Sequence, residues 1–334
     1  MKIFVTGGAG FIGSNFIRYV ISQHPDWEIT NFDKLTYAGN LENLKDIDKS
    51  PRYNFVKGDI TDRKMVNQAL VTGFDAIINF AAESHVDRSI FDSSPFVETN
   101  FKGTQVLLDA AREYKVKSYL QVSTDEVYGS CENGYFDESS PLNPSSPYAA
   151  CKAAADLLCL SYHRTYSLPV VITRCTNNYG PYQFPEKLIP LVITNALEDR
   201  PIPVYGDGLY QRNWIYVMDH CCALEMVLMK GKPGEIYNIT GGQEKTNLEL
   251  ITLILGILGK PESLITFVKD RPGHDRRYAI TSSKINRELG WQPSYAYEQT
   301  LKSTVGWYLN NRAWWERVKN KEYLEYYNRM YRNR

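Results

Sequence analysis

A glycine-rich loop near the N-terminus constrains the fold of this 334-residue chain more than any other feature. Ile3–Val5 is typical of a short buried strand, and Phe11–Val20 has the apolar spacing of a helix. Gly7 and Gly10 lie between the strand and the helix, and Gly13 lies in the first turn of the helix; together they form the pattern G-x-x-G-x-x-G. Such glycines let the backbone approach a pyrophosphate at the N-terminus of the helix. The loop therefore predicts a dinucleotide-binding β-α-β unit.

A carboxylate at the end of the second expected strand, Glu28–Phe32, indicates which dinucleotide binds. Asp33 follows Gly13 by about 20 residues, where an acidic side chain accepts hydrogen bonds from the adenosine ribose. Because a carboxylate repels a 2′-phosphate, we predict NAD rather than NADP, although the neighbouring Lys34 weakens this preference. By topology we expect Asp59-Ile60 near the adenine and Ala81-Ala82 near the pyrophosphate and nicotinamide ribose.

The first half of the chain alternates short apolar runs with helical patterns. Further strands are expected at Tyr53–Val56, Ala76–Phe80 and Ser118–Ser123, with one long helix over Phe96–Tyr114. Strands that alternate with helices predict a doubly wound parallel sheet of the Rossmann type, covered on both faces.

The alternation ends after Arg174, where the turn-rich segment 177–181 and the breaker segment 200–203 begin. Helices are expected at Leu188–Leu197, Val217–Met229 and Asn247–Leu258, with Asn247 as the N-cap of the last. We predict an NAD-binding domain over residues 1–174, interleaved with segments near 213–240. Residues 175–334 then form mainly a smaller α/β substrate lobe. The aromatic tail from Trp307 onward is expected to pack on the body or to contact another subunit.

Composition excludes several classes of partner. Lysine plus arginine equals aspartate plus glutamate at 38 each, so no basic field predicts nucleic-acid binding. No apolar run is long enough for a membrane span, and no signal-peptide pattern is present. The six cysteines contain no CxxC pair, which favours free thiols in a cytoplasmic protein. Among the five histidines only His220 adjoins a cysteine, so no metal site is expected.

Tyr148 and Lys152 form the pattern Y-x-x-x-K and lie one turn apart on an expected helix, capped by Ser146 and begun by Pro147. A phenol titrates near pH 10, and a nearby ammonium group together with the positive nicotinamide of NAD⁺ is expected to lower its pKa. Tyr148 then takes a proton from a sugar hydroxyl while NAD⁺ takes the hydride.

The glycine loop, Y-x-x-x-K and the segment Asn177-Asn178-Tyr179-Gly180-Pro181 together resemble the extended short-chain dehydrogenase/reductase family. The resemblance covers nearly the whole chain. The family includes epimerases, decarboxylases, reductases and dehydratases, so the fold alone does not choose the reaction.

The run Thr124-Asp125-Glu126 follows an expected strand and narrows the choice of reaction. Thr124 is a hydroxyl partner for the oxygen that Tyr148 deprotonates. Two adjacent carboxyl groups suit an elimination, in which Glu126 removes the C5 proton and protonated Asp125 gives a proton to the departing C6 hydroxyl. An acidic turn exposed to water is the alternative.

This run, with residues 33–40 and 81–89, resembles the nucleotide-sugar 4,6-dehydratases of the family, and the resemblance implies dTDP-glucose as substrate. It implies that NAD is held by Gly7, Gly10, Phe11, Ile12, Gly13, Asp33, Lys34, Leu35, Thr36, Asp59, Ile60, Ala81, Ala82, Thr99, Tyr148, Lys152 and Asn178. It further implies that the nucleotide-diphosphate sugar is held by Ser84, Thr124, Asn177, Lys187, Leu188, Pro203, Tyr205, Arg212, Asn247, Arg271 and His274. Arg212 and Arg271 suit bidentate phosphate contacts.

One alternative within the family is a UDP-glucose 4,6-dehydratase, whose substrate carries uracil, a base that differs from thymine by one methyl group. The other is a UDP-sugar epimerase or decarboxylase, which does not need both acids. A non-catalytic NAD-binding scaffold would not need Tyr148 and Lys152. We also expect a homodimer, because the helices around Phe96–Tyr114 and Pro147–Ser167 carry apolar residues on more than one face. The apolar residues in question are Val106, Leu107, Leu108, Leu157, Leu158 and Leu160.

Overall fold

A central sheet of seven parallel strands organises the computed structural model, which describes residues 1–331 except the side chains of residues 321 and 322. Its strand order is β10-β6-β5-β4-β1-β2-β3, and every neighbouring pair is parallel. The strands are β1 (Lys2–Thr6), β2 (Glu28–Asp33), β3 (Tyr53–Lys57), β4 (Ala76–Asn79), β5 (Ser118–Thr124), β6 (Val170–Cys175) and β10 (Ile236–Ile239). The order reverses between β1 and β4, which is where ligands bind in sheets of this type.

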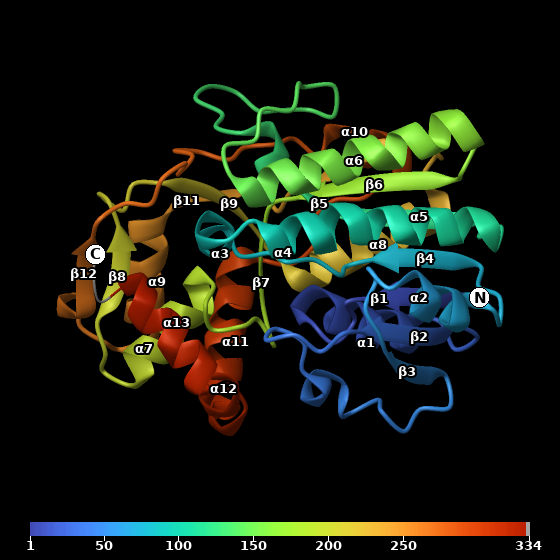
Figure 1. Cartoon of the computed structure of the whole chain (residues 1–334). Helices are drawn as coiled ribbons and strands as arrows, with labels where there is room; N and C mark the ends of the chain where they lie inside the picture. Colours follow the sequence, from blue (N-terminus) through green and yellow to red (C-terminus); the bar gives the residue numbers. More distant parts are fainter. Residues whose placement is uncertain (332–334) are drawn as a thin grey trace.

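Helices cover both faces of this sheet (Figure 1). On one face α1 (Phe11–Gln23) and α8 (Val217–Lys230) bury Phe16, Ile17 and Leu224 against the strands. On the other face lie α2 (Arg63–Leu70), α5 (Thr104–Glu113) and α6 (Pro147–Tyr166). The doubly wound, Rossmann-type architecture predicted from the sequence is thus confirmed.

The long helix expected over Phe96–Tyr114 is interrupted. A short α4 (Ser94–Phe96) leads into a π-helical segment, η2 (Val97–Gly103), before α5 begins. The Thr104 hydroxyl donates to the carbonyl of Asn100 at 2.7 Å, and the Asn100 amide pairs with both backbone groups of Glu83 at 2.9 Å. The wider turn therefore lets Asn100 anchor the loop after β4, and π-helical turns often mark such functional positions.

Two other local predictions were wrong. Asn247 is the first residue of α9 (Asn247–Leu258), and Thr246 is its N-cap, in a capping box with Glu249. The breaker segments both contain strands, because β7 (Asn177–Tyr179) pairs with β9 (Gln211–Tyr216) and β8 (Ile202–Tyr205) pairs with β12 (Ile265–Val268).

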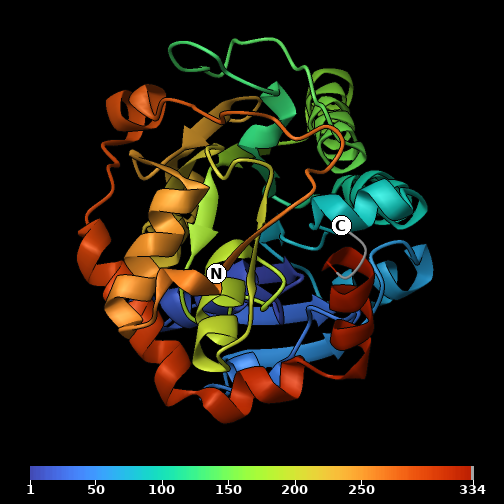
Figure 2. The same ribbon diagram turned by 90° about the vertical axis from the view of Figure 1, so that its left-hand side faces the viewer.

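A second core lies beyond the carboxyl ends of the main strands. It is formed by β8, β9, α7 (Leu188–Leu197), α9, α11 (Tyr297–Asn310) and α12 (Arg312–Val318). β11 (Gln243–Thr246) completes a small sheet with β9 and β7. Figure 2 shows the C-terminal helices running along the outside of the molecule, past the N-terminal strands.

The aromatic tail packs on the body of the chain. Trp314, Trp315 and Tyr323 are buried, and Trp314 Nε1 donates to Asn43 Oδ1 at 2.9 Å. α13 (Lys321–Tyr331) then returns toward the cleft between the two cores. Within residues 1–331, none of the helices has the length and apolar character that a membrane crossing requires.

Candidate active site

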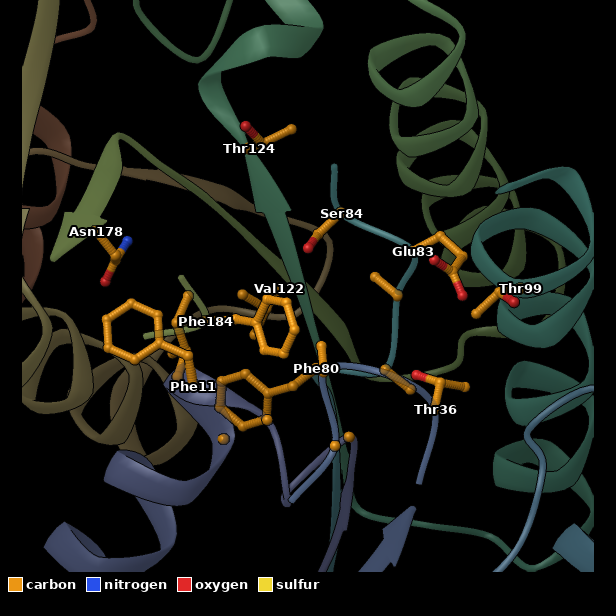
Figure 3. A pocket seen from close by; sticks show the side chains of 18 of the residues that line it. Phe11, Thr36, Phe80, Glu83, Ser84, Thr99, Val122, Thr124, Asn178 and Phe184 are labelled. Carbon is orange, nitrogen blue, oxygen red and sulfur yellow. The ribbon is translucent and has the colours of Figure 1, made fainter. Parts of the chain in front are cut away.

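A cavity of about 290 Å³ follows the carboxyl ends of the main strands. Figure 3 shows Thr124 and Asn178 toward one end of it and Thr36 and Thr99 toward the other. The residues predicted for NAD line this cavity, namely Gly7, Gly10, Phe11, Ile12, Gly13, Asp33, Lys34, Thr36, Asp59, Ile60, Ala81, Ala82, Thr99, Tyr148, Lys152 and Asn178. Leu35 is the exception among the predicted NAD residues, because it does not line the cavity.

The glycine loop is shaped for close approach of a ligand. Gly7 has φ +68°, and a Cβ there would lie 2.5 Å from the backbone nitrogen of Ala81. A Cβ on Gly13 would lie 2.5 Å from the carbonyl oxygen of Gly7. α1 begins after Gly10 without a side-chain cap, so its first N–H groups remain available to an anion. The loop and helix together form a cradle for a pyrophosphate.

Asp33 is fixed by the backbone at the end of β2. Its two carboxylate oxygens accept hydrogen bonds from the N–H groups of Ala9, at 2.9 Å, and Leu35, at 2.8 Å. Leu35 thus contributes through its backbone, in a left-handed conformation with φ +59°. Lys34 turns to Asp59, and their charged groups lie 2.7 Å apart. Lys34 is the cation next to Asp33 that would attract a 2′-phosphate, and its ion pair with Asp59 already neutralises it.

Asn178 is oriented by a buried histidine. Its amide Nδ2 donates to the carbonyl of Thr176 at 3.0 Å, and its Oδ1 lies 2.9 Å from His220 Nδ1. Burial lowers the pKa of His220 to about 3, so the ring is neutral and its Nδ1 donates to Asn178. His220 therefore has a hydrogen-bonding role. Over residues 1–331 no group of three His, Cys, Asp or Glu side chains is arranged to hold a metal ion.

Two acids stand where β5 ends, of which Asp125 is buried and Glu126 is partly buried. Thr124 is its last residue, and Asp125 and Glu126 open the 3-10 turn η3 (Asp125–Tyr128). The Thr124 hydroxyl donates to Asp125 Oδ1 and accepts from the Glu126 N–H, both at 3.3 Å. Asp125 Oδ2 and Glu126 Oε2 are buried without a hydrogen-bond partner in the described part of the chain. The acidic turn is therefore enclosed, and two of its oxygens can receive a ligand.

Burial changes the protonation of both acids. It raises the pKa of Asp125 to about 8, helped by the negative charge of Glu126 and opposed by Arg212. Burial also raises the pKa of Glu126, but Arg271, Lys187 and Arg212 oppose that rise. Because the cations act mainly on Glu126, the pair suits a protonated Asp125 beside an ionised Glu126.

Tyr148 and Lys152 enter the same cavity from the first turns of α6. The helix starts as predicted, with Ser146 accepting from the Ala149 N–H at 3.2 Å and Pro147 in the first turn. Lys152 Nζ donates to the Val122 carbonyl at 2.6 Å. The expected lowering of the Tyr148 pKa by Lys152 does not occur in the chain by itself. Burial and the charge of Glu126 raise that pKa well above its ordinary value.

A second cavity opens from the first beside Glu126 and extends between the two cores. The residues Asn177, Glu186 and Lys187 also line both cavities. Of the residues predicted for the nucleotide sugar, Leu188, Pro203, Tyr205, Arg212, Asn247, Arg271 and His274 line the second cavity, and Ser84 and Thr124 line the first. The fold thus brings all of them to one continuous cleft.

Two arginines, Arg271 and Arg212, line the second cavity. Arg271 lies 3.5 Å from Asp87, and its buried Nε has no hydrogen-bond partner within residues 1–331. Arg212 donates to the carbonyls of Gln211 and Asp275 at 2.8 and 2.9 Å, which fixes the plane of its guanidinium group. A guanidinium carries five N–H donors, so hydrogen atoms remain for a bound phosphate. Two largely enclosed arginines with N–H groups left to donate suit a diphosphate.

His274 and Asn247 complete the walls of the second cavity. Burial, with Arg271 and Arg212 nearby, lowers the pKa of His274 to about 3, so the ring stays neutral. The ring stacks on Tyr210 with centroids 3.7 Å apart. The Asn247 Oδ1 atom is buried, has no partner among the described residues and offers a further polar contact.

Glu186 lines both cavities but was not predicted from the sequence. Its side chain is 2% exposed, pairs with Arg88 at 3.0 Å and accepts from the Tyr37 hydroxyl at 3.0 Å. Arg88 stacks between the rings of Tyr37 and Tyr326, 3.8 and 4.1 Å from their centroids. This cluster joins the loop after β2, the helix after β4 and α13, so no local pattern predicts it. Tyr331, which lines the second cavity, was missed for the same reason.

The comparisons with known proteins agree with this geometry. Residues 4–304 match the family model described as GDP-mannose 4,6 dehydratase. A dTDP-glucose 4,6-dehydratase of Streptomyces niveus is 52% identical over 326 residues, which cover 96% of this chain and 97% of that protein. The crystal structure of DesIV, a dTDP-glucose 4,6-dehydratase from Streptomyces venezuelae with NAD bound, has a TM-score of 0.94 and 53% identity, covering 96% of this chain and 100% of that one.

The fold is also shared with enzymes of other specificity. A UDP-glucose 4-epimerase from Thermotoga maritima has a TM-score of 0.87 at 28% identity, over 93% of this chain and 100% of that one. The chain belongs to the GDP-mannose 4,6 dehydratase family, a group of extended short-chain dehydrogenase/reductase proteins. Within this family, its curated relatives at about 50% identity are dTDP-glucose 4,6-dehydratases.

Proposed function

We propose that the protein catalyses the NAD-dependent 4,6-dehydration of dTDP-glucose to dTDP-4-keto-6-deoxyglucose. One observation carries the proposal: the acids Asp125 and Glu126, each with one buried carboxylate oxygen, line the same cavity as Tyr148 and Lys152. An epimerase needs only the second pair, whereas an elimination needs both. The curated relatives with this activity span nearly the whole chain.

The residues present fit NAD. A Cβ would fill the cradle at Gly7 and Gly13, and the fixed carboxylate of Asp33 suits two ribose hydroxyls. Lys34 is paired with Asp59, which favours NAD over NADP. We assign the cofactor to the residues that line the first cavity, with Leu35 acting through its N–H group. When bound, NAD⁺ supplies a hydride acceptor for C4 and a positive charge beside Tyr148, and the same hydride returns to C6.

The first step needs a base at the 4-hydroxyl. Tyr148 takes this proton, and the Thr124 hydroxyl holds the same sugar oxygen. Lys152 donates to the Val122 carbonyl, and its positive charge together with that of bound NAD⁺ would favour the phenolate of Tyr148. A ketone at C4 then makes the C5 proton acidic.

The second step is the loss of water. Glu126 takes the C5 proton, and Asp125 gives a proton to the C6 oxygen as the C6–O bond breaks. Glu126 returns its proton to C5 after C6 has been reduced. The proton that Tyr148 gained replaces the one that Asp125 lost, so the net change is loss of one water molecule.

The second cavity holds the nucleotide diphosphate. We assign the diphosphate to Arg212 and Arg271 and the nucleoside to the walls near Leu188, Pro203, Tyr205, Asn247 and His274. Ser84, Asn177 and Lys187 line the first cavity together with the two acids, and we assign the sugar to this region. Residues 1–174 with the segments near 213–240 then serve as the cofactor domain, and residues 175–334 serve mainly as the nucleotide-sugar lobe.

The test is incubation of the purified protein with dTDP-glucose, UDP-glucose or UDP-glucuronate in separate reactions without added reductant. We expect loss of water by mass, and a 4-keto product by its absorbance in alkali, from dTDP-glucose. Water loss from UDP-glucose alone would change the substrate and keep the mechanism. An epimer or CO₂ in place of water loss would refute the assigned roles of Asp125 and Glu126.

We also propose a homodimer through α5 and α6, which lie side by side on one face of the molecule (Figure 1). Val106, Leu107 and Leu108 are buried within the chain itself and do not support it. The proposal is supported by the exposed apolar side chains of Leu157 on α6, which is 58% exposed, and of Val97 and Phe101 on η2. Light scattering should give twice 38.3 kDa. A Leu157→Glu variant should be monomeric, and an unchanged mass for it would place the interface elsewhere.

The cytoplasm is the proposed compartment. All six cysteines are free, and five of them are buried, as expected for a protein that folds under reducing conditions. Alkylation of the denatured protein, taken directly from cells, should label all six thiols.

A further inference from the structure

A buried polar network lies next to the elements that carry the proposed catalytic residues, and its members lie outside the lining of both cavities. Arg174 on β6 is 2% exposed, and its Nε donates to Asp156 Oδ2 at 2.9 Å. Asp156 is 0% exposed and sits one turn after Lys152 on α6. Arg174 Nη1 donates to the Tyr128 hydroxyl at 2.8 Å, and that hydroxyl donates to Asn238 Oδ1 at 2.9 Å. The network thus connects α6, β6, η3 and β10.

Tyr128 connects the network to the turn that carries the two acids. Tyr128 is the last residue of η3, the turn that begins with Asp125 and Glu126. Its ring is 1% exposed and stacks on Phe136, with centroids 5.4 Å apart. Gly129 follows with φ +79°, and a Cβ there would clash with the Asn143 carbonyl oxygen. The turn is therefore enclosed on its far side, and the Tyr128 hydroxyl attaches it to β6 and β10.

The network joins two elements that the reaction must keep in register. α6 carries Tyr148 and Lys152, which act at C4, whereas η3 carries Asp125 and Glu126, which act at C5 and C6. Both attachments end on the same guanidinium group, because Arg174 binds Asp156 of α6 with Nε and Tyr128 of η3 with Nη1. A buried ion pair adds little net stability compared with apolar packing, but it can enforce one arrangement of its surroundings.

We propose that Tyr128 is a positioning residue that, through Arg174 and Asp156, fixes the Asp125–Glu126 turn relative to the helix that carries Tyr148 and Lys152. This inference rests on the proposed function and adds residues to it that do not contact substrate. It predicts that loss of the Tyr128 hydroxyl slows the elimination more than the oxidation at C4.

The test compares Tyr128→Phe with Tyr119→Phe. Tyr119 is a matched control, since it is 0% exposed, lies on β5, and donates its hydroxyl to Gln121 at 3.1 Å, outside the network. Both variants lose one buried hydroxyl and keep their ring, so their melting temperatures should fall by similar amounts. We expect kcat of Tyr128→Phe to fall by about 10- to 100-fold, as for other small displacements of catalytic groups, with little change in KM. Tyr119→Phe should keep the kcat of the unchanged protein.

The cofactor reports which step has slowed. If the elimination is impaired, the fraction of bound nicotinamide in the reduced form during turnover should be higher in Tyr128→Phe than in the unchanged protein or in Tyr119→Phe. Equal kcat and equal reduced fractions for the two variants would overturn the proposal. A fall in kcat without a rise in the reduced fraction would also overturn it. Absence of water loss in the unchanged protein would instead refute the proposed function, so the two failures are distinguishable.

Discussion

Asp125 and Glu126 are consecutive residues of one 3-10 turn, yet each has a buried carboxylate oxygen without a hydrogen-bond partner among the described residues. Adjacent side chains on a strand would point to opposite faces, whereas this turn, at the end of β5, presents both to one cavity. An unpaired buried carboxylate oxygen is costly. The two unpaired carboxylate oxygens in this cavity therefore lower the stability of the fold, and such a cost is typical of a catalytic site.

Asp125 is predicted to be the acid. With its pKa raised to about 8, Asp125 is protonated at neutral pH and loses its proton as pH rises through that value. The rate of water loss should therefore decline above about pH 8. Asp125→Asn should lower kcat by roughly 10²- to 10⁴-fold, because an amide cannot protonate the leaving oxygen. A pH–rate profile of the elimination checks this, and full activity of Asp125→Asn would contradict it.

The same pKa shift predicts an effect on stability. A carboxyl whose pKa is raised on folding binds more protons in the native state than in the unfolded state between about pH 4 and pH 8. Its contribution to the free energy of unfolding is fully present below this window and is lost as pH rises through it. Asp125→Asn should remove that part of the pH dependence in urea titrations. An identical pH dependence in the variant would show that Asp125 titrates normally.

Glu126 is predicted to be the base. Glu126→Gln keeps the size of the side chain and removes the acceptor of the C5 proton, so water loss should fall by about 10²- to 10⁴-fold. Oxidation at C4 should persist, because Tyr148 and Lys152 are unchanged. Reduced nicotinamide should then accumulate on the enzyme after substrate is added. If no reduced nicotinamide forms, Glu126 is needed before the elimination and its assigned role is wrong.

Sequence patterns predicted the parts of the site that depend on short-range geometry. The glycine loop, Asp33 at the end of β2 and the Ser146-Pro147 start of α6 are each determined by neighbours in the sequence, and the structure has them as predicted. The α-helical and strand patterns of the first half succeeded for the same reason. The fold class followed from their alternation.

Long-range contacts were beyond such patterns. The π-helical segment depends on Asn100 reaching the backbone of Glu83, and Glu186 meets Arg88 across 98 residues of sequence. Burial and the charge of Glu126 raise the pKa of Tyr148 in the chain alone, and neither contribution can be read from the Y-x-x-x-K pattern. The assignment of Arg271 and His274 rested on family resemblance, since the run around them is locally a turn.

Gly7 offers a test of the cofactor cradle. Gly7→Ala combines a positive φ with a clash against the backbone of Ala81, so it should destabilise the fold and abolish NAD binding. Gly73 is the control, because it has φ +78° but a Cβ added there would meet no atom of the described residues within 4 Å. Gly73→Ala should cost only about 1 kcal/mol and leave NAD affinity unchanged. Calorimetric titration with NAD separates the two, and equal affinities would refute the cradle.

Arg271 offers a test of the diphosphate site. Its guanidinium lies 3.5 Å from Asp87, and its buried Nε has no hydrogen-bond partner in the part of the chain that the structure describes. Arg271→Gln removes a charge-assisted contact worth about 1.5 to 3 kcal/mol, so the Kd for the nucleoside diphosphate should rise by roughly 10- to 100-fold. Arg276 on the same loop is the control, because it is exposed and paired with Asp207 at 2.8 Å. Arg276→Gln should leave Kd unchanged. If both variants bind alike, Arg271 does not hold the diphosphate.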